Sequence, residues 1–259
     1  MNDIRLGIQL YSLRNTGDMR EQILQARSAG FDHIETIGAH LVDADLRATA
    51  RTSNVQIMSG HVGIEQVRDD PDAIVATAQA CSIDRLFIPG ISKPERPQNT
   101  QEFIHFGAEL GELSQRFQKG GIELGWHNHD WEFRAPAGRP APFDLIMQGA
   151  SGSGLKWQAD LGWVYRANGD PIGALRAYRD HVTSVHVKDS LAPAMPSEED
   201  GWCDIGLGVI DWPGLIHLAL EIGVRDFVLE HDKPKRPEAF AKAGHMAVED
   251  MLHEALRMG

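Results

Sequence analysis

The regular alternation of short apolar runs with longer segments of helical periodicity constrains the fold of this chain more than any other feature. Eight apolar runs are predicted to be β-strands, at residues 5–11, 33–37, 56–60, 85–88, 123–129, 155–160, 184–188 and 226–230. The segments between them carry apolar residues at helical spacing, which predicts helices near residues 17–29, 41–53, 71–82, 100–119, 142–149, 171–179, 212–222 and 237–257. Strands that alternate with helices in this way indicate repeated βα units and a parallel sheet.

Eight βα units close naturally into a (β/α)8 barrel, a fold that needs about 250 residues. The chain has 259 residues, of which 42% are hydrophobic and 24% charged, a composition typical of globular proteins. Residues 28–32 and 221–226 repeat the same transition from a helix through glycine to a strand. We therefore expect residues 1–259 to form one TIM barrel domain of the α/β class.

Charge and hydropathy disfavour several classes of partner. The first hydrophobic segment, residues 4–13, contains Arg5 and Gln9 and has no basic leader, so it does not resemble a signal peptide. No stretch approaches the roughly 18 apolar residues of a membrane span, and we expect a cytoplasmic protein. The formal charge of −12 would repel nucleic acid. Cys81 and Cys203 are too few for a disulfide framework.

The predicted strand ends carry a set of polar side chains. In a (β/α)8 barrel the chemistry lies at the carboxyl ends of the strands, and residues two apart on a strand share a face. A single His or Asp at such a position is usually structural, but burying several ionisable groups together without a ligand costs several kcal/mol. A divalent cation neutralises carboxylates and accepts imidazole lone pairs. The four residues predicted to bind a metal are His127, Asp160, His186 and Glu230.

Four phrases of the sequence resemble a known family. They are GIQLYSLR at residues 7–14, WHNHDWEF at 126–133, VHVKD at 185–189 and GLGVIDW at 206–212. These phrases resemble the xylose isomerase-like barrel superfamily, and more narrowly its sugar phosphate isomerase/epimerase family. The resemblance extends over essentially the whole chain, and the His-Asn-His and His-Val-Lys-Asp phrases are its most specific parts.

The resemblance implies a metal site and a class of chemistry. Ketose 3-epimerases of this superfamily bind Mn²⁺ or a similar ion through Glu, Asp, His and Glu, and their two glutamates act as acid and base. Asp160, His186 and Glu230 match the last three ligands, but His127 stands where those enzymes have their first glutamate. A metal-bound imidazole has no lone pair left for proton transfer. In this respect the chain is more similar to inosose dehydratases and 3-keto-glycoside lyases, which eliminate a group beside a ketone.

Several functions therefore stay open at this point. The first is a metal-dependent isomerase or epimerase that removes a proton next to a metal-polarised carbonyl of a keto-sugar or keto-cyclitol. The second is a β-eliminating lyase or dehydratase, which would release an aglycone or water where an isomerase conserves mass. An endonuclease IV-like DNA-repair enzyme fits poorly, because the chain is acidic and lacks evident ligands for three metals. A sugar-binding barrel without catalytic activity is the remaining hypothesis.

Further residues at the predicted barrel mouth are candidates for catalysis and binding. Glu230 is the predicted base, and His129, Glu132 and Lys188 are candidates for the other catalytic roles. Each has a plainer interpretation: His129 could orient a metal ligand, Lys188 could pair with a neighbouring aspartate, and Glu132 could simply be solvated. The predicted substrate-binding residues are Gln9, Tyr11, Glu35, His61 and Trp131.

The predicted cofactor is one divalent metal ion. Two imidazoles and two carboxylates suit Mn²⁺ best, with Co²⁺, Fe²⁺, Zn²⁺ and Mg²⁺ as alternatives. The sequence has no glycine-rich dinucleotide turn or phosphate loop. The long loop at residues 190–205 has no basic cluster, which favours an uncharged sugar or cyclitol over a sugar phosphate. The resemblance also implies a homo-oligomer.

Overall fold

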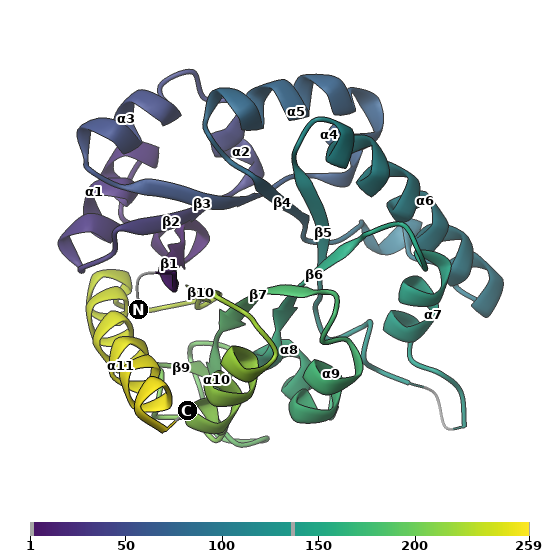
Figure 1. Cartoon of the computed structure of the whole chain (residues 1–259). Coiled ribbons are helices and arrows are strands. Elements are labelled where there is room, and N and C mark those ends of the chain that lie inside the picture. Colours follow the sequence, from purple (N-terminus) through teal and green to yellow (C-terminus); the bar gives the residue numbers. More distant parts are fainter. Residues whose placement is uncertain (1–2, 136–137, 259) are drawn as a thin grey trace.

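The computed structural model describes residues 3–135 and 138–258 and shows a closed barrel of parallel strands inside a ring of helices (Figure 1). The barrel strands are β1 (Arg5–Gln9), β2 (His33–Thr36), β3 (Gln56–His61), β4 (Arg85–Ile88), β5 (Glu123–His127), β6 (Lys156–Asp160), β7 (Val182–Val187) and β10 (Asp226–Leu229). Each barrel strand pairs with the next one along the chain, and β10 closes the barrel against β1. The predicted (β/α)8 fold is confirmed.

Helices cover the outside of the barrel. Those that match the predicted helices are α1 (Met19–Ser28), α3 (Leu46–Thr52), α5 (Pro71–Ala80), α6 (Thr100–Lys119), α7 (Pro142–Gly149), α9 (Pro171–Ala177), α10 (Trp212–Glu221) and α11 (Pro237–Met258). The chain ends return to one another, since α11 lies beside α1 (Figure 1). None of the helices in the described ranges is long and apolar enough to cross a membrane.

Several short elements were not predicted. They are α2 (Gly38–Leu41), α4 (Ile64–Asp69), α8 (Leu161–Arg166), the 3-10 helices η1 (Leu10–Leu13) and η2 (Lys93–Glu95), and the strands β8 (Asp189–Ser190) and β9 (Trp202–Cys203). Elements this short have too few turns to show a period. The predicted strand at 5–11 was therefore wrong at its end, where η1 begins at Leu10 and the Gln9 side chain accepts a hydrogen bond from Tyr11 N.

The two helix–glycine–strand phrases are confirmed as equivalent structural transitions. Gly30 follows α1 with a φ of +111°, and Gly223 follows α10 with a φ of +96°. This left-handed backbone is strained for residues with a Cβ and lets the chain turn from the helix into the next strand.

The two faces of the strands have different chemistry. On the outer faces, apolar side chains such as Trp126 and Trp157 are buried against the helices. The inner faces carry many small or polar residues, and where a large side chain such as Phe87 points inward, the residue on the neighbouring strand is small. At Gly125, for example, a Cβ would lie 2.7 Å from the Phe87 ring, so Phe87 occupies the volume that a side chain on β5 would need.

A charged cluster lies at the amino-terminal end of the barrel, opposite the polar strand ends. Arg5 donates to both carboxylate oxygens of Asp226, at 2.7 Å and 2.6 Å. Arg85 also bonds to Asp226 and lies 2.7 Å from Glu123. The Asp226 side chain is 3% exposed, so these bonds join β1, β4, β5 and β10 around a nearly buried carboxylate.

Removing the central carboxylate of this cluster should destabilise the fold. We expect Asp226→Ala to lower the free energy of unfolding by about 3 kcal/mol, because it leaves two arginines with part of their charge buried and unpaired. Urea denaturation of the metal-free protein measures this effect. Asp72→Ala is the matched control, since Asp72 and Arg116 form an exposed pair, and its stability should equal that of wild type. Equal losses in both variants would contradict a structural role for the cluster.

Candidate metal centre

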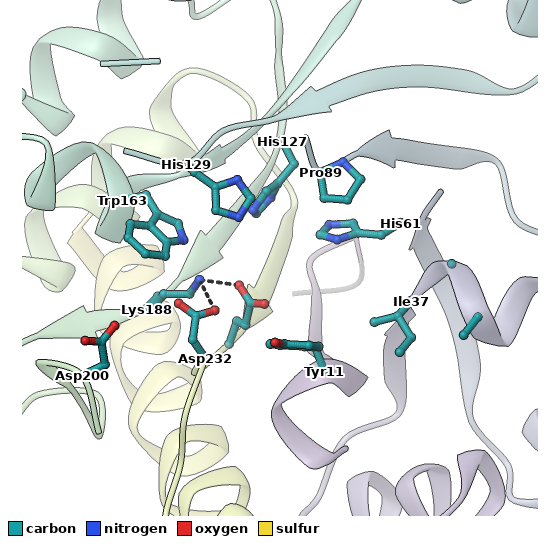
Figure 2. A pocket seen from close by; sticks show the side chains of 13 residues that line it. Tyr11, Ile37, His61, Pro89, His127, His129, Trp163, Lys188, Asp200 and Asp232 are labelled. Carbon is teal, nitrogen blue, oxygen red and sulfur yellow. Dashed lines mark hydrogen bonds and ion pairs between the residues drawn. The ribbon is translucent and has the colours of Figure 1, made fainter. Parts of the chain in front are cut away.

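A cavity of about 500 Å³ opens at the carboxyl-terminal ends of the barrel strands (Figure 2). Its lining residues are Tyr11, Ile37, Gly38, Ala39, His61, Pro89, His127, His129, Trp163, Lys188, Asp200, Glu230 and Asp232. The predicted polar strand ends thus meet at one cavity, although they come from distant parts of the chain.

Asn128 fixes the end of β5 against β6. Its Oδ1 accepts hydrogen bonds from Trp157 Nε1 at 2.8 Å and from Asp160 N at 3.0 Å, while its Nδ2 donates to Asp160 O at 3.1 Å. Asn128, the middle residue of the His-Asn-His phrase, therefore connects the ends of β5 and β6 through hydrogen bonds. It holds His127 and Asp160 at adjacent strand ends.

Asp160 presents one oxygen to the site. Its Oδ1 accepts from Trp163 N at 2.9 Å and so caps the amino terminus of α8. Its Oδ2 is buried and accepts no hydrogen bond of acceptable geometry among the described residues, although Lys188 Nζ is 2.9 Å away. A buried carboxylate oxygen without a proper donor is an available ligand atom.

Gln158 determines which nitrogen of His127 faces the site. Its Nε2 donates to Glu35 Oε2 at 2.6 Å, so its Oε1 must be the atom that lies 2.9 Å from His127 Nδ1. His127 therefore carries its proton on Nδ1 and directs the lone pair of Nε2 toward Asp160 Oδ2, 3.8 Å away. The same Oε1 lies 2.7 Å from His61 Nε2.

Glu35 orients His186 in the same manner. Glu35 Oε1 lies 2.7 Å from His186 Nε2, which is therefore the protonated nitrogen. The other nitrogen, Nδ1, lies 2.9 Å from Glu230 Oε2. Burial lowers the pKa of His186, but the charges of Glu35 and Glu230 outweigh burial and raise it to about 10. With no cation present, a proton occupies the space between Nδ1 and Glu230.

The four predicted ligands meet in space. His127, Asp160, His186 and Glu230 offer ligand atoms that all lie within 4.8 Å of one another. A second group within the same limit consists of His61, His127 and His186. The contacts to Glu35 and Gln158 engage the same nitrogens of His127 and His186 in both groups. The residues present fit a divalent ion better at the four-residue set, because its two carboxylates supply the negative charge that three imidazoles lack.

The charges around Lys188 point to the same site. Its buried ammonium lies 2.7 Å from Glu230 and 2.9 Å from Asp160. It also lies 3.1 Å from Asp232 (Figure 2). Burial raises the pKa of Asp160, and Glu230 also raises it. Burial opposes ionisation of Glu230 too, but Lys188 and His186 hold its pKa well below the ordinary value. Three carboxylates facing one ammonium leave negative charge that a divalent cation would neutralise.

Some of the other candidate residues line the cavity, and others are buried beneath it or lie in a neighbouring cavity. Tyr11, His61, His129 and Lys188 line the cavity. Gln9 and Glu35 are fully buried beneath it and bond to each other at 2.8 Å, so they support the site from below and do not reach its cavity. Trp131 lines an adjoining cavity.

Glu132 does not lie in the cavity. Its carboxyl group is fully buried and accepts hydrogen bonds from Trp126 Nε1 and His129 N, both at 3.0 Å. Burial raises the pKa of Glu132 to about 8, since the hydrogen bonds offset only part of the desolvation. The prediction of a mouth-facing catalytic Glu132 was wrong: the chain turns after His129, and the side chain reaches back to the outer face of β5.

Sequence reasoning missed Asp232 as a site residue. It lines the cavity and contacts Lys188, and burial raises its pKa to about 6. Its position two residues after Glu230 is the signal that could have identified it. Trp163 also lines the cavity, whereas Trp126 and Trp202 are buried in the protein core.

The raised pKa of Glu132 makes a testable contribution to stability. A carboxyl group with a raised folded-state pKa stabilises the fold below its unfolded pKa of about 4.3 and loses this contribution as pH rises through about 8. An amide does not titrate, so the stability of Glu132→Gln relative to wild type should rise between about pH 5 and about pH 9. This rise comes on top of a pH-independent loss, because the NH₂ group of the amide must face the N–H donor of Trp126 or His129. Urea denaturation at each pH measures the difference. The exposed Glu112→Gln is the control; a pH-independent difference for Glu132→Gln would contradict the expectation.

Comparison with known proteins places the chain in a family. The family model described as xylose isomerase-like TIM barrel matches residues 23–251. A sugar phosphate isomerase/epimerase from Parabacteroides distasonis has a TM-score of 0.77 at 17% identity, over 95% of this chain and 98% of that chain. The IOLI protein, solved with a zinc atom, has a TM-score of 0.78 at 15% identity, over 97% and 99%. An L-ribulose 3-epimerase has a TM-score of 0.74 at 13% identity, over 98% and 96%.

No curated protein sequence matches the chain at a significant level. The structural likenesses are at low identity and show a shared fold, whereas the family model covers most of the chain. The resemblance to the xylose isomerase-like barrels that was inferred from the four sequence phrases is confirmed. The chain belongs to the xylose isomerase-like TIM barrel family.

Proposed function

We propose that the chain is a divalent-metal-dependent enzyme that isomerises a keto-sugar or keto-cyclitol by removing a proton next to its carbonyl group. The observation that carries this proposal is the convergence of two imidazoles and two carboxylates next to an open cavity, which His127 and Glu230 line and behind which Asp160 and His186 are buried. Mn²⁺ suits this mixed nitrogen and oxygen set. Similar folds in a zinc-containing protein and in an L-ribulose 3-epimerase agree with it.

The proposed ion would be held by His127, Asp160, His186 and Glu230. When bound, it supplies Lewis acidity to the substrate carbonyl and so acidifies the neighbouring C–H. The protein holds the ligands on rigid strand ends, and Gln158 and Glu35 fix the tautomers of the two histidines. This arrangement holds the two rings in place when the ion binds, and the ion would replace the proton between His186 and Glu230.

Glu230 is the proposed base. It lines the cavity, and its pKa lies well below the ordinary value because Lys188 and His186 outweigh its burial. The carboxylate is therefore ionised at neutral pH and able to accept a proton. A weak base of this kind requires an acidified C–H, which is the contribution expected of the ion.

The groups around Glu230 favour chemistry that uses a single base. Burial and, to a smaller extent, the charge of Lys188 lower the pKa of His129 to about 3, so its imidazole is neutral and has no acidic proton to return. Figure 2 shows His129 on the opposite side of the cavity from Asp232. In a one-base isomerisation Glu230 would move the proton between neighbouring carbons, and the hydroxyl proton of the substrate would pass to the former carbonyl oxygen. Such a reaction does not need an acid on the opposite side of the cavity.

β-Elimination is the second candidate, and Lys188 is the observation that favours it. Its ammonium is charged, since the neighbouring carboxylates outweigh its burial and raise its pKa, and it lies 2.7 Å from Glu230. After Glu230 removes the proton, an ammonium on the same side of the cavity can protonate a departing hydroxyl or glycosyl oxygen. Mass spectrometry of the products separates the two candidates, because elimination divides the substrate and isomerisation conserves its mass.

The metal assignment makes a stoichiometric prediction. Purified or Mn²⁺-reconstituted protein should contain about one divalent ion per chain. Asp160→Ala and His186→Ala should lose the ion. Both variants should remain folded, because the apolar core lies between the strands and the surrounding helices and does not include these two side chains. His61→Ala should retain it. Metal analysis after gel filtration, with circular dichroism as the folding control, makes the measurement. Retention in Asp160→Ala combined with loss in His61→Ala would favour the three-imidazole set.

The base assignment is tested by Glu230→Gln. The amide oxygen can still coordinate an ion but cannot take up the proton, so turnover should fall by about 10²–10⁴-fold. The measurement is solvent deuterium exchange at the carbon next to the ketone in metal-saturated protein, across ketoses, inososes and 3-keto-glucosides. Glu132→Gln is the matched control, since the same change at a buried residue outside the cavity should leave exchange intact. Undiminished exchange in Glu230→Gln would assign the base to another residue.

A further inference from the structure

A second cavity adjoins the first one. It also measures about 500 Å³ and shares Pro89 and His129 with the first as common walls. Figure 2 shows these two residues along one side of the first cavity, across from Tyr11 and Asp232. A ligand that occupied both spaces would therefore have to pass His129 or Pro89.

Arg96 in this second cavity has donors without acceptors. Its guanidinium lies 4.7 Å from the centre of the Trp131 ring. Its Nε is buried without a hydrogen-bond partner, and Arg96 makes no ion pair within residues 3–135 and 138–258. Arginine stacked on an aromatic face keeps its N–H edge available for ligand oxygens. Because Nε is buried, the donors that a ligand in the cavity could reach are those of the two terminal Nη groups.

The carboxylates that line the second cavity are directed at other arginines. Glu65 lies 2.8 Å and Glu95 3.7 Å from Arg68 Nη1, and Asp130 pairs with Arg134. None of these carboxylates pairs with Arg96, although they share the cavity with it. The N–H groups at the edge of the Arg96 guanidinium are therefore available to a ligand, and they would bind acceptor oxygens.

We propose that the second cavity is a subsite for a second, oxygen-rich group of a two-part substrate, such as the second ring of a glycoside, and that Arg96 recognises this group. The inference rests on the proposed function for the placement of the reacting ring in the first cavity. His129 stands at the boundary, where the bond between the two parts would pass. The second group is a neutral sugar ring or carries a carboxylate, since both offer acceptor oxygens to a guanidinium.

Binding measurements test the subsite independently of turnover. The probes are α- and β-linked glucosyl disaccharides, the matching methyl glucosides as one-ring ligands, and the matching aldonic acids as the anionic arm. Isothermal titration calorimetry is carried out on the Mn²⁺-loaded protein. We expect a disaccharide or its acid to bind about tenfold to a hundredfold more tightly than its methyl glucoside, since hydrogen bonds to a charged donor are lost in the smaller ligand.

Arg96→Ala should remove most of this preference while leaving the affinity for the methyl glucoside unchanged. Arg134→Ala is the matched control, because Arg134 is exposed and paired with Asp130, and it should keep the preference. A stronger preference for the acid would identify the second group as anionic, and an equal one as neutral.

Two results would overturn the inference: equal affinity of one-ring and two-ring ligands for wild type, or a preference that survives Arg96→Ala. Failure of the proposed function looks different. Wild type would then bind two-part ligands in an Arg96-dependent manner, yet show neither deuterium exchange nor product with their keto forms.

Discussion

One buried negative charge organises the polar end of this barrel. Glu35 is fully buried, and its carboxylate accepts hydrogen bonds from Gln9 at 2.8 Å, Ser59 at 2.6 Å, Gln158 at 2.6 Å and His186 at 2.7 Å. Burial alone would raise the pKa of Glu35, but the nearby imidazoles and these donors lower it to about 2. The interior therefore holds a permanent acceptor, and every polar neighbour must present a donor to it.

The orientation of the candidate ligands follows from this requirement. Because Gln158 must direct its NH₂ group at Glu35, its oxygen is left for His127, and because His186 directs Nε2 at Glu35, its Nδ1 is left for the site. Neither ring can flip without leaving a buried donor or acceptor unsatisfied. The geometry at the cavity is thus determined one layer below it, by residues that a substrate does not reach.

The ring of predicted ligands could be read from the sequence because two local rules suffice. Strand alternation determines which side chains share a face, and the parallel topology brings all carboxyl ends to one rim. These rules do not apply to Glu132, because the chain turns beyond the end of β5. Its contact with Trp126 depends on tertiary packing and could not be predicted from strand alternation. Arg96 and the short helices at the mouth belong to the connections between strands and longer helices. These connections have no repeating hydrophobic pattern from which the direction of a side chain could be predicted.

His127 stands where the ketose 3-epimerases that the sequence resembles have a glutamate, and a neutral imidazole in this position makes the net charge of the proposed site less negative. With a dication in the proposed site, the charges of Asp160 and Glu230 are compensated, and the ammonium of Lys188 is left opposite Asp232. The charges at the cavity then cancel, and the buried carboxylate of Glu35 beneath it leaves one negative charge, whereas a carboxylate in place of His127 would add a second. Removing a proton next to a carbonyl adds one negative charge to the substrate, and surroundings with less negative charge oppose this less. With an imidazole in place of a carboxylate, the proposed site has no second carboxylate base, but negative charge can develop on the substrate at a lower energetic cost. Both features are expected of one-base chemistry.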